Sequence, residues 1–306
     1  MDLTIVVINF NTKELTRKCL DSILKNTKNL LYEIVVVDNA STDGSQTFLL
    51  RLYRKIRFIS FIGNKKNLGF AKANNQGARK AKGKFILFLN SDTEIYDNVL
   101  GEMCEWMDQK QKVAVSTCAL VNKNGTLQGS GGYFPTLPRV FSWMFFIEDI
   151  PYLDKLIKPF HPVHMKSFFY KGLSQFKKMR SQDWITGAFF LVKRDVFEEV
   201  GGFDEDYFMY TEEVDLCFRI KKLGFEVWYL PQWEIVHLGG ASSTNEFPIL
   251  SEFKSVELYY QKNMPRWQYQ YLRIFLKCGT VIRALVFGML SGREAYKLYA
   301  KANRAI

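Results

Sequence analysis

The sequence has too few cysteines and histidines for the common structural zinc sites. Its 306 residues include three histidines and five cysteines, and no two cysteines form a Cys-x-x-Cys pair. Zinc fingers and zinc ribbons therefore do not fit this chain. The odd, scattered set of thiols, at positions 19, 104, 118, 217 and 278, predicts free buried cysteines in a reducing compartment rather than a disulfide framework.

Long apolar runs are also missing. No uninterrupted stretch reaches the roughly 18 apolar residues that a membrane span requires. A strand pattern at 4–8 begins almost at the N-terminus, without the basic region, separate apolar stretch and cleavage site of a signal peptide. We therefore expect a cytoplasmic protein.

Glycine-rich phosphate loops are absent as well. The segment 67–77, Asn-Leu-Gly-Phe-Ala-Lys-Ala-Asn-Asn-Gln-Gly, follows an expected strand and opens an expected helix. It has neither the Gly-x-x-x-x-Gly-Lys spacing of a P-loop nor the Gly-x-Gly-x-x-Gly spacing of a dinucleotide-binding turn. A tight turn that begins a helix is the simpler interpretation of this segment.

The chain does carry an excess of positive charge. It has 42 Lys and Arg against 31 Asp and Glu, which gives a net charge of +11. Basic proteins attract nucleotide phosphates, nucleic acids and anionic membranes, and composition alone does not distinguish among these partners. The hydrophobic content of 47% is ordinary for a globular protein with a large core.

Strand and helix patterns alternate through the first hundred residues. Apolar runs predict strands at 4–8, 33–37, 56–62 and 85–89, and helical spacing predicts helices at 12–26, 45–54 and 74–82. Successive strand–helix–strand units indicate an α/β fold with a doubly wound, mostly parallel sheet flanked by helices.

The second half of the chain is less regular. Residues 133–181 have no clear period, and we interpret them as a long, partly helical excursion from the core. Core patterns then predict strands at 184–192, 225–230 and 234–237, helices at 195–200 and 211–223, and a helical tail from 253 onward. We therefore divide the sequence into a main domain, residues 1–245, and a C-terminal amphipathic helical region, residues 246–306.

Oxygen-bearing side chains follow the strand expected at 85–89. Asn-Ser-Asp at 90–92 stands at its carboxyl end, Asp38 ends the second strand, and Phe10 follows the first. Ligands of open α/β sheets bind at this edge. An aromatic residue and two carboxylates at adjacent strand ends suit a base, a ribose and a metal-bound diphosphate. A polar strand-to-loop turn is the alternative interpretation of the segment 90–92.

A second cluster of acids opens the helix expected at 211–223. Glu212 and Asp215 share a face of that helix, and Asp215 can pair with Arg219 one turn later. Acids in a first turn also favour the helix dipole, which accounts for two of the three carboxylates. The remaining one is a candidate general base.

His237 follows the last expected strand and precedes two glycines. Imidazole is an acceptable ligand for manganese-like ions, so His237 can join Asp92 beside a diphosphate. A structural role is the alternative for a single histidine at a strand end.

The basic and apolar tail also has two interpretations. Seven apolar residues between 272 and 290 can share one helical face, with Arg273, Lys277 and Arg283 elsewhere. Such a helix can lie in a membrane interface, or it can pack on its own domain or on a second subunit. We expect peripheral contact with the inner face of a membrane.

Taken together, these motifs resemble those of family 2 glycosyltransferases. They are Ile-Val-Val-Ile-Asn-Phe-Asn at 5–11, Val-Val-Asp-Asn-Ala-Ser-Thr-Asp-Gly at 36–44, Asn-Leu-Gly-Phe-Ala at 67–71, Leu-Asn-Ser-Asp-Thr at 89–93, Thr-Gly-Ala-Phe-Phe-Leu-Val-Lys-Arg at 186–194, Gly-Gly-Phe-Asp-Glu at 201–205, Glu-Glu-Val-Asp-Leu-Cys-Phe-Arg-Ile at 212–220 and His-Leu-Gly-Gly at 237–240. Their order matches the family, and the likeness is greatest to its rhamnosyltransferase-like branch.

The resemblance implies a GT-A fold and an inverting transfer of a sugar, with rhamnose as one candidate, from a nucleotide diphosphate-sugar. The acceptor would be a hydroxyl of a glycan or a lipid-linked sugar in cell-surface polysaccharide synthesis. Residues 133–181 would lie on the acceptor side of the active site. The family's Asp-x-Asp metal motif matches the segment 90–92, where asparagine replaces the first acid.

The resemblance also implies roles for individual residues. The catalytic base matches Glu213, with Asp215 as the second choice. The implied nucleotide-binding residues are Phe10, Asp38, Asn67, Ser91 and Asp92, the implied acceptor-binding residues are Trp184 and Glu212, and Asp92 and His237 would hold Mg²⁺ or Mn²⁺.

Two rival functions remain open at this point. A sugar-phosphate nucleotidyltransferase usually opens with a glycine-rich basic loop after its first strand, and residues 9–13 contain no glycine. A basic nucleic-acid-binding module is disfavoured because the positive charge is spread along the chain without a recognisable motif. We expect no nucleic-acid partner, and an oligomer is compatible with the sequence.

Overall fold

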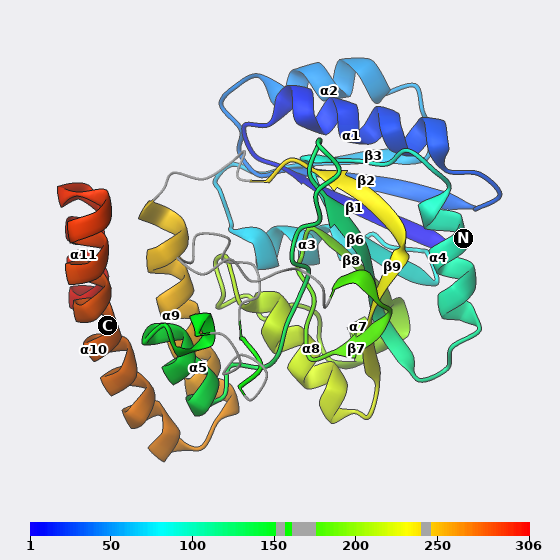
Figure 1. The fold of residues 1–306 in the computed structure, drawn as a ribbon. Helices are drawn as coiled ribbons and strands as arrows, with labels where there is room; N and C mark the ends of the chain where they lie inside the picture. The colour runs from blue at the N-terminus through cyan, green and yellow to red at the C-terminus, as the bar shows by residue number, and fades with distance from the viewer. Residues whose placement is uncertain (151–156, 161–175, 240–245) are drawn as a thin grey trace.

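The computed structural model describes residues 1–150, 157–160, 176–239 and 246–306. Within these ranges a mixed sheet of nine strands forms the centre of the molecule, and helices cover its faces (Figure 1). The strand order is β3-β2-β1-β4-β8-β6-β9-β5, and β7 pairs with β9 outside this path. The strands are β1 (Leu3–Asn9), β2 (Tyr32–Asp38), β3 (Ile59–Gly63), β4 (Phe85–Asn90), β5 (Thr93–Glu94), β6 (Val113–Val121), β7 (Arg180–Gln182), β8 (Phe189–Lys193) and β9 (Glu226–His237).

The N-terminal half of the sheet is parallel and buried on both faces. Strand β1 pairs in parallel with β2 and β4, and β2 pairs in parallel with β3. Successive residues enter different hydrophobic clusters, since Val6 and Phe88 belong to one and Val7 and Leu87 to the other. Burial on both faces explains why these strands read as continuous apolar runs. The helices between them are α1 (Lys13–Asn26), α2 (Ser45–Tyr53), α3 (Phe70–Ala78) and α4 (Val99–Asp108).

The second half of the sheet is mixed. Strand β8 runs antiparallel to both β4 and β6, whereas β6 and β9 are parallel. The remaining elements before the tail are α5 (Leu137–Met144), η1 (Ile147–Asp149), α7 (Arg194–Glu199) and α8 (Glu212–Lys222). Much of the excursion expected at 133–181 lies outside the described residues.

Some element boundaries differ from the expected ones. Helix α3 starts at Phe70 rather than at residue 74, because the Phe70 N–H donates to Phe208 O and Gly69 takes a φ of +83°. Strand β8 starts at Phe189, opposite Leu89 of β4, and Ala188 still bonds to Asn90, so residues 184–187 continue past the end of β4. Helix α4 was not expected.

The two strands expected at 225–230 and 234–237 form one strand, β9. Its register against β6 shifts where Leu230 and Glu234 oppose consecutive residues of β6, and the intervening residues form a bulge. In the sequence, the residues of this bulge interrupt the strand pattern, which is why two separate strands were predicted.

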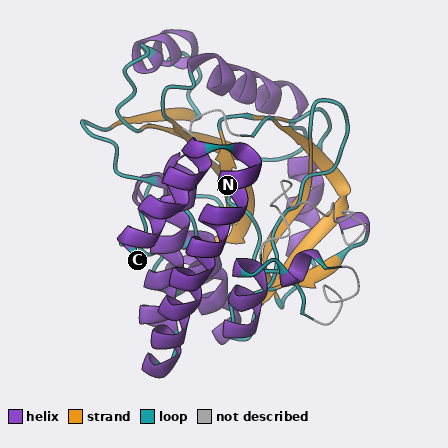
Figure 2. Cartoon of the chain, turned by 60° about the vertical axis from the view of Figure 1, so that its left-hand side comes forward, coloured by secondary structure: helices purple, strands orange, loops and turns teal. Residues whose placement is uncertain are grey.

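The tail folds into three helices, α9 (Glu246–Asn263), α10 (Arg266–Ser291) and α11 (Arg293–Ala305), which gather with α5 beside the sheet (Figures 1 and 2). Phe253, Tyr259 and Tyr260 of α9 are buried in the same hydrophobic cluster as Val214 of α8. Helix α9 therefore shares a core with the sheet domain.

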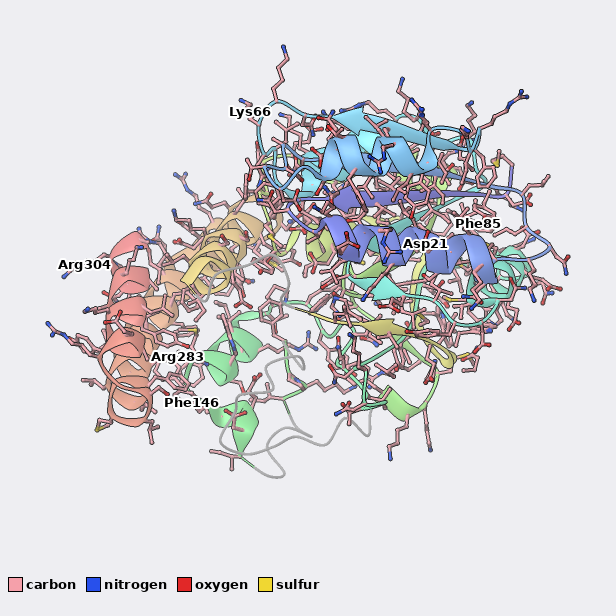
Figure 3. The ribbon with its side chains drawn as sticks, turned by 90° about the horizontal axis from the view of Figure 1, so that it is seen from above. Asp21, Lys66, Phe85, Phe146, Arg283 and Arg304 are labelled. Carbon is pink, nitrogen blue, oxygen red and sulfur yellow. The ribbon has the colours of Figure 1, made fainter. Side chains whose placement is uncertain are left out.

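Helix α10 is fixed to α5 by a buried arginine. Arg283 is 9% exposed, and its guanidinium donates to the carbonyl oxygens of Trp143 and Met144 at the end of α5. It also lies 4.6 Å from the ring centroid of Phe146 (Figure 3). Cations at a helix C-terminus satisfy carbonyls that have no intrahelical partner.

We predict that Arg283→Met lowers the free energy of unfolding by about 2–4 kcal/mol, because a hydrogen bond to a charged group contributes roughly 1.5–3 kcal/mol. Urea unfolding followed by circular dichroism measures the change. Arg293→Met, at an exposed position of α11, is the matched control and should change stability by less than about 0.5 kcal/mol. Equal effects of the two substitutions would show that the Arg283 contacts do not hold α10.

Candidate functional site

The polar strand ends meet at one edge of the sheet, as expected. Asn9 of β1 lies opposite Asp38 of β2, and Ile8 lies opposite Asn90 of β4. The carboxyl ends of three neighbouring parallel strands are therefore level. This edge is the usual ligand-binding crevice of a doubly wound sheet.

Asp38 organises the loops at this edge. Its Oδ1 accepts a hydrogen bond from Asn9 Nδ2 at 2.6 Å, and its Oδ2 accepts one from the Ser41 N–H at 3.1 Å. The side chain is nearly buried, and each carboxylate oxygen has further acceptor capacity. Asp38 therefore fixes the turn after β2 and still presents lone pairs at the strand end.

A network of amides joins the turn after β2 to the loop before α3. Asn39 Nδ2 donates to Asn67 Oδ1 at 2.8 Å, and Asn39 Oδ1 accepts from the Leu68 N–H at 3.0 Å. Asn67 also accepts from the Gly69 N–H, so its side chain shapes this loop. Sequence reasoning selected Asn67 but missed Asn39, whose position directly after Asp38 was the available signal.

The loop before α3 touches the segment that leads into α8. A Cβ atom built on Gly69 would lie 2.4 Å from Phe208 O, so only glycine permits this approach. The loop that carries Asn67 therefore lies beside the chain that carries the second acidic cluster.

Two further predicted nucleotide-binding residues occupy different surroundings. Ser91 is buried, and its hydroxyl lies 3.0 Å from Thr12 Oγ1 within a polar network under the strand ends. Phe10 is partly exposed beside Asn11, whose Oδ1 accepts a hydrogen bond from the Thr42 N–H at 2.7 Å. The structure thus turns Ser91 toward the interior and leaves Phe10 at the rim.

Asp92 and His237 face each other across the pairing of β5 with β9. His237 Nε2 lies 3.4 Å from Asp92 Oδ1, and His237 Nδ1 lies 2.7 Å from Gln128 Oε1. Gln128 Nε2 donates to Asn122 Oδ1 and to His237 O, which leaves Oε1 as the acceptor of the Nδ1 proton. With Nδ1 paired to Gln128, His237 directs its Nε2 toward the carboxylate of Asp92.

His237 Nε2 and the Asp92 carboxylate can share a proton, or both can bind a cation placed between them. Nitrogen and carboxylate oxygen suit a Mn²⁺-like ion, and the bond from Gln128 is the outer support that metal-bound histidines commonly have. Across the described residues no three His, Cys, Asp or Glu side chains gather as a metal site. Asp92 and His237 therefore fit an ion that takes its other ligands from a diphosphate and water.

The acids of the second cluster open α8 after a strained turn. Tyr210 and Thr211 have φ values of +72° and +69°, which cost roughly 1–3 kcal/mol each for residues with a side chain. Directly after them stand Glu212 and Glu213. Such strain is typical of segments whose position the surrounding structure dictates, and functional sites are common among these segments.

Burial changes the protonation of the two glutamates. It raises the pKa of Glu212 well above its usual value, and the neighbouring Glu213 raises it further. Burial, together with the charge of Glu252 on α9, raises the pKa of Glu213 to about 7. In the described structure one Oε2 atom of each glutamate is buried without a hydrogen-bond partner. Burial and the neighbouring charge thus favour the neutral form of Glu212, whereas Glu213, with a pKa of about 7, is poised between its two forms at neutral pH.

Asp215 is occupied by other contacts. Its Oδ2 accepts from Arg219 Nε at 2.8 Å, and its Oδ1 accepts from Asn263 Nδ2, at the end of α9, at 2.7 Å. The side chain is 2% exposed. These two hydrogen bonds indicate that Asp215 holds α8 in place. Glu213, in contrast, has a buried Oε2 atom without a hydrogen-bond partner.

Trp184 lies inside the core. Its ring is buried and its Nε1 donates to Tyr133 O at 3.0 Å. In this position it supports the segment 184–188, which continues from β8 past the sheet edge, and it has little surface to offer to an acceptor. Glu212 is similarly buried.

Comparison with known proteins identifies the family of the chain. The model of glycosyl transferase family 2 matches residues 4–201. The N-acetylglucosaminyl-diphospho-decaprenol L-rhamnosyltransferase of Mycobacterium tuberculosis is 24% identical over 82% of this chain and 81% of its own length. The rhamnosyltransferase WbbL of Escherichia coli is 25% identical over 76% of this chain and 82% of its own length.

Solved structures share the fold at lower identity. A crystal structure of GalNAc-T7 with UDP, GalNAc and Mn²⁺ matches 99% of this chain with a TM-score of 0.61 at 18% identity. The match spans 54% of that longer chain. The fold is therefore the GT-A fold of glycosyltransferases, and because the family model covers well over half of its residues, the chain belongs to glycosyl transferase family 2.

Proposed function

We propose that the chain is an inverting glycosyltransferase that moves a sugar from a nucleotide diphosphate-sugar to a hydroxyl of a glycan or lipid-linked acceptor. The observation that carries this proposal is Glu213, a carboxylate with an unpartnered buried oxygen and a pKa raised to about 7. A general base works best when its pKa lies near the working pH. The contact of the Asn67 loop with the segment before α8 supports its place on the donor side of the site.

The chemistry is a single displacement. Glu213 accepts the proton of the acceptor hydroxyl while that oxygen bonds to the anomeric carbon and the diphosphate departs from the opposite face. Asp92 and His237 would hold a divalent cation, Mg²⁺ or Mn²⁺, which neutralises charge on the departing diphosphate. Asp38 and Phe10, at the ends of β2 and β1, are our candidates for contact with the nucleoside.

Both relatives described above are named as rhamnosyltransferases, and the name of one of them includes a diphospho-decaprenol carrier. We therefore propose a deoxyhexose donor such as a nucleotide-linked rhamnose, and an acceptor sugar on a lipid diphosphate. Release of nucleoside diphosphate from a panel of nucleotide-sugars tests the donor directly.

We predict that Glu213→Gln lowers kcat by about 10²–10⁴-fold, the usual contribution of a general base, and leaves donor binding unchanged. Because the base must be ionised, kcat/KM of the native enzyme should rise with pH through a limb near 7. Coupled detection of nucleoside diphosphate measures both quantities.

The matched comparison is Asp215→Asn, which keeps the shape of a residue that holds α8. It should lower stability and change kcat less than Glu213→Gln does. An active Glu213→Gln enzyme together with an inactive, folded Asp215→Asn enzyme would assign the base to Asp215.

For the metal site we predict that Asp92→Ala abolishes the Mn²⁺-dependent part of nucleoside diphosphate binding, because one of two protein ligands is lost. Calorimetry with and without Mn²⁺ measures this part separately from turnover. Asp97→Asn, an exposed acid five residues later, is the control and should bind normally. Unchanged Mn²⁺ dependence in Asp92→Ala would rule out the proposed site.

We also propose that the outer face of α10 rests on an anionic membrane. The helix contains no Asp or Glu, and it is long and apolar enough to cross a membrane by composition, with a mean hydropathy of 1.7 in its most apolar window. Its inner face packs on α5, α9 and α11. Its outer face exposes large apolar side chains, including Trp267, Tyr271, Ile274, Val281, Leu285 and Met289. One face of this helix packs on protein and the other is apolar. Such a helix is better suited to lie in the plane of the membrane interface than to cross the membrane.

We predict that full-length protein sediments with phosphatidylglycerol vesicles and that added salt weakens this binding. The double substitution Ile274→Glu and Leu285→Glu should abolish vesicle binding. Both residues are 55% exposed, and the anionic lipid surface would repel the new carboxylates instead of burying apolar side chains. Leu31→Glu, 68% exposed near β2, is the control and should still sediment. Equal sedimentation of all three proteins would contradict docking through α10.

A further inference from the structure

Acidic side chains are absent from one long segment of the chain. Residues 44–91 contain eleven Lys and Arg and no Asp or Glu, whereas the remaining residues hold 31 of each kind. The net charge of +11 therefore belongs entirely to this segment. It runs from α2 through β3 and α3 to the end of β4. The excess charge thus belongs to the parallel half of the sheet, at whose carboxyl edge the candidate donor site lies.

Contacts with acids neutralise only a few of these cations. Lys72 and Arg79 lie 3.2 and 3.5 Å from the carboxylate oxygens of Glu205, and Lys84 pairs with Asp108. The other eight cations of the segment are exposed, and none of them forms a salt bridge within the described part of the chain. Their charges therefore remain available to an anion.

Two of the exposed cations stand beside the candidate donor site. Lys65 and Lys66 follow the carboxyl end of β3, where Gly63 lies opposite Asp38 of β2. The Asn64 N–H donates to Asp38 O at 2.9 Å. The lysine pair is therefore next to the strand end that we propose to contact the nucleoside.

Amide hydrogen bonds hold both ends of this lysine pair. Asn64 Nδ2 donates to Asn39 Oδ1 at 3.1 Å, and Asn39 Nδ2 donates to Asn67 Oδ1 at 2.8 Å. The side chain of Asn64 also exchanges two hydrogen bonds with that of Gln76 on α3. The residues directly before and after the pair are thus tied to the turn after β2, while Lys66 lies at the rim of the molecule (Figure 3).

The segment 64–67, which we call the lysine loop, is distant from the proposed metal site. Strands β2 and β1 separate β3 from β4, and neighbouring strands lie about 4.8 Å apart, so the ends of β3 and β4 are about 14 Å apart. Asp92 and His237 belong to the β4 end. At physiological salt the field of an exposed charge extends about 8 Å. The lysine loop therefore acts on an anion that approaches past it rather than on a diphosphate already bound at Asp92.

We propose that the lysine loop captures the anionic nucleotide diphosphate-sugar during its approach and so raises its association rate constant. The proposal rests on the proposed function, which supplies an anionic donor. Charges of one sign beside a binding cleft raise the rate of encounter by about 10–10³-fold, and this gain falls as ionic strength rises. The dissociation rate constant depends on contacts in the bound complex, so it does not depend on the loop.

Stopped-flow fluorescence tests the proposal without an acceptor and without turnover. The probes are uridine and thymidine diphosphates that carry an N-methylanthraniloyl label. Lys65→Gln combined with Lys66→Gln should lower the association rate constant by about 3–10-fold at low ionic strength and leave the dissociation rate constant unchanged. At about 1 M salt, where charges are screened within roughly 3 Å, the variant and the native protein should converge. An effect confined to dissociation would indicate direct contact with the bound nucleotide and overturn the proposal.

Two matched variants separate the loop from net charge and from loop structure. Helix α2 leads away from the carboxyl edge toward the start of β3, so Arg51 and Arg54, both exposed, lie toward the opposite edge. Arg51→Gln combined with Arg54→Gln removes the same charge there and should slow association by less than about twofold. Equal slowing by both glutamine pairs would assign the effect to net charge and overturn the proposal. Lys65→Arg combined with Lys66→Arg keeps the charge and should keep the native rate.

Other anions and the proposed function are tested separately. Phosphatidylglycerol vesicles form one arm, because lysines at an exposed edge also attract lipid headgroups. Loss of vesicle binding in the lysine-to-glutamine variant, with a native association rate for the nucleotides, would assign the loop to a lipid surface and overturn the proposal. If no nucleoside diphosphate from a panel of bases binds the native protein with or without Mn²⁺, the proposed function fails. If nucleotides bind and the variant associates as fast as the native protein, only the capture role is wrong.

Discussion

Burial of both faces of the parallel strands is the constraint on which the site depends. Because β1, β2 and β4 are covered above and below, the middle of each strand is lined by apolar side chains of the two hydrophobic clusters. The polar side chains lie toward the strand ends, with Thr4 and Glu33 near the start of β1 and β2 and Asn9, Asp38 and Asn90 at the carboxyl edge. The loops that follow these strand ends contact one another although they are distant in sequence. They carry further polar residues of the candidate site, such as Asn67.

The acids of α8 show how the same residue types acquire different tasks from their surroundings. Asp215 is satisfied by Arg219 and by Asn263, and it anchors the helix. Glu213 has a buried oxygen without a partner, and its pKa rises to about 7. Glu212, beside it, is pushed further toward the neutral acid. Desolvation and hydrogen bonding, rather than the identity of the carboxylates, separate a structural acid from a candidate base.

The sequence was sufficient for the features that local pattern determines. Alternating strands and helices predicted the α/β sheet, and the positions of Asp38 and Asp92 at strand ends predicted their common edge. His237 beside Asp92 was also predictable as a candidate, because it follows the last strand.

Features that depend on long-range contacts were not predictable. Gln128 contacts His237 Nδ1 from 109 residues away, and Asn263 donates to Asp215 across 48 residues. Trp184 was predicted to bind the acceptor, yet the fold buries its ring and its Nε1 donates to Tyr133 O. No local pattern carries this information, because each of these roles depends on how separate elements pack.

The end of α9 has a mechanical consequence. Lys262 binds Asp204 and Asp206 in the loop before α8, and its neighbour Asn263 binds Asp215 within α8. Two adjacent residues thus clamp the catalytic helix from both sides of Glu213. Any displacement of α9 relative to the sheet must therefore break these contacts or carry α8 and the loop before it along. The C-terminal region is thus tied to the helix that carries Glu213, and removal of α9 would also remove contacts that hold α8.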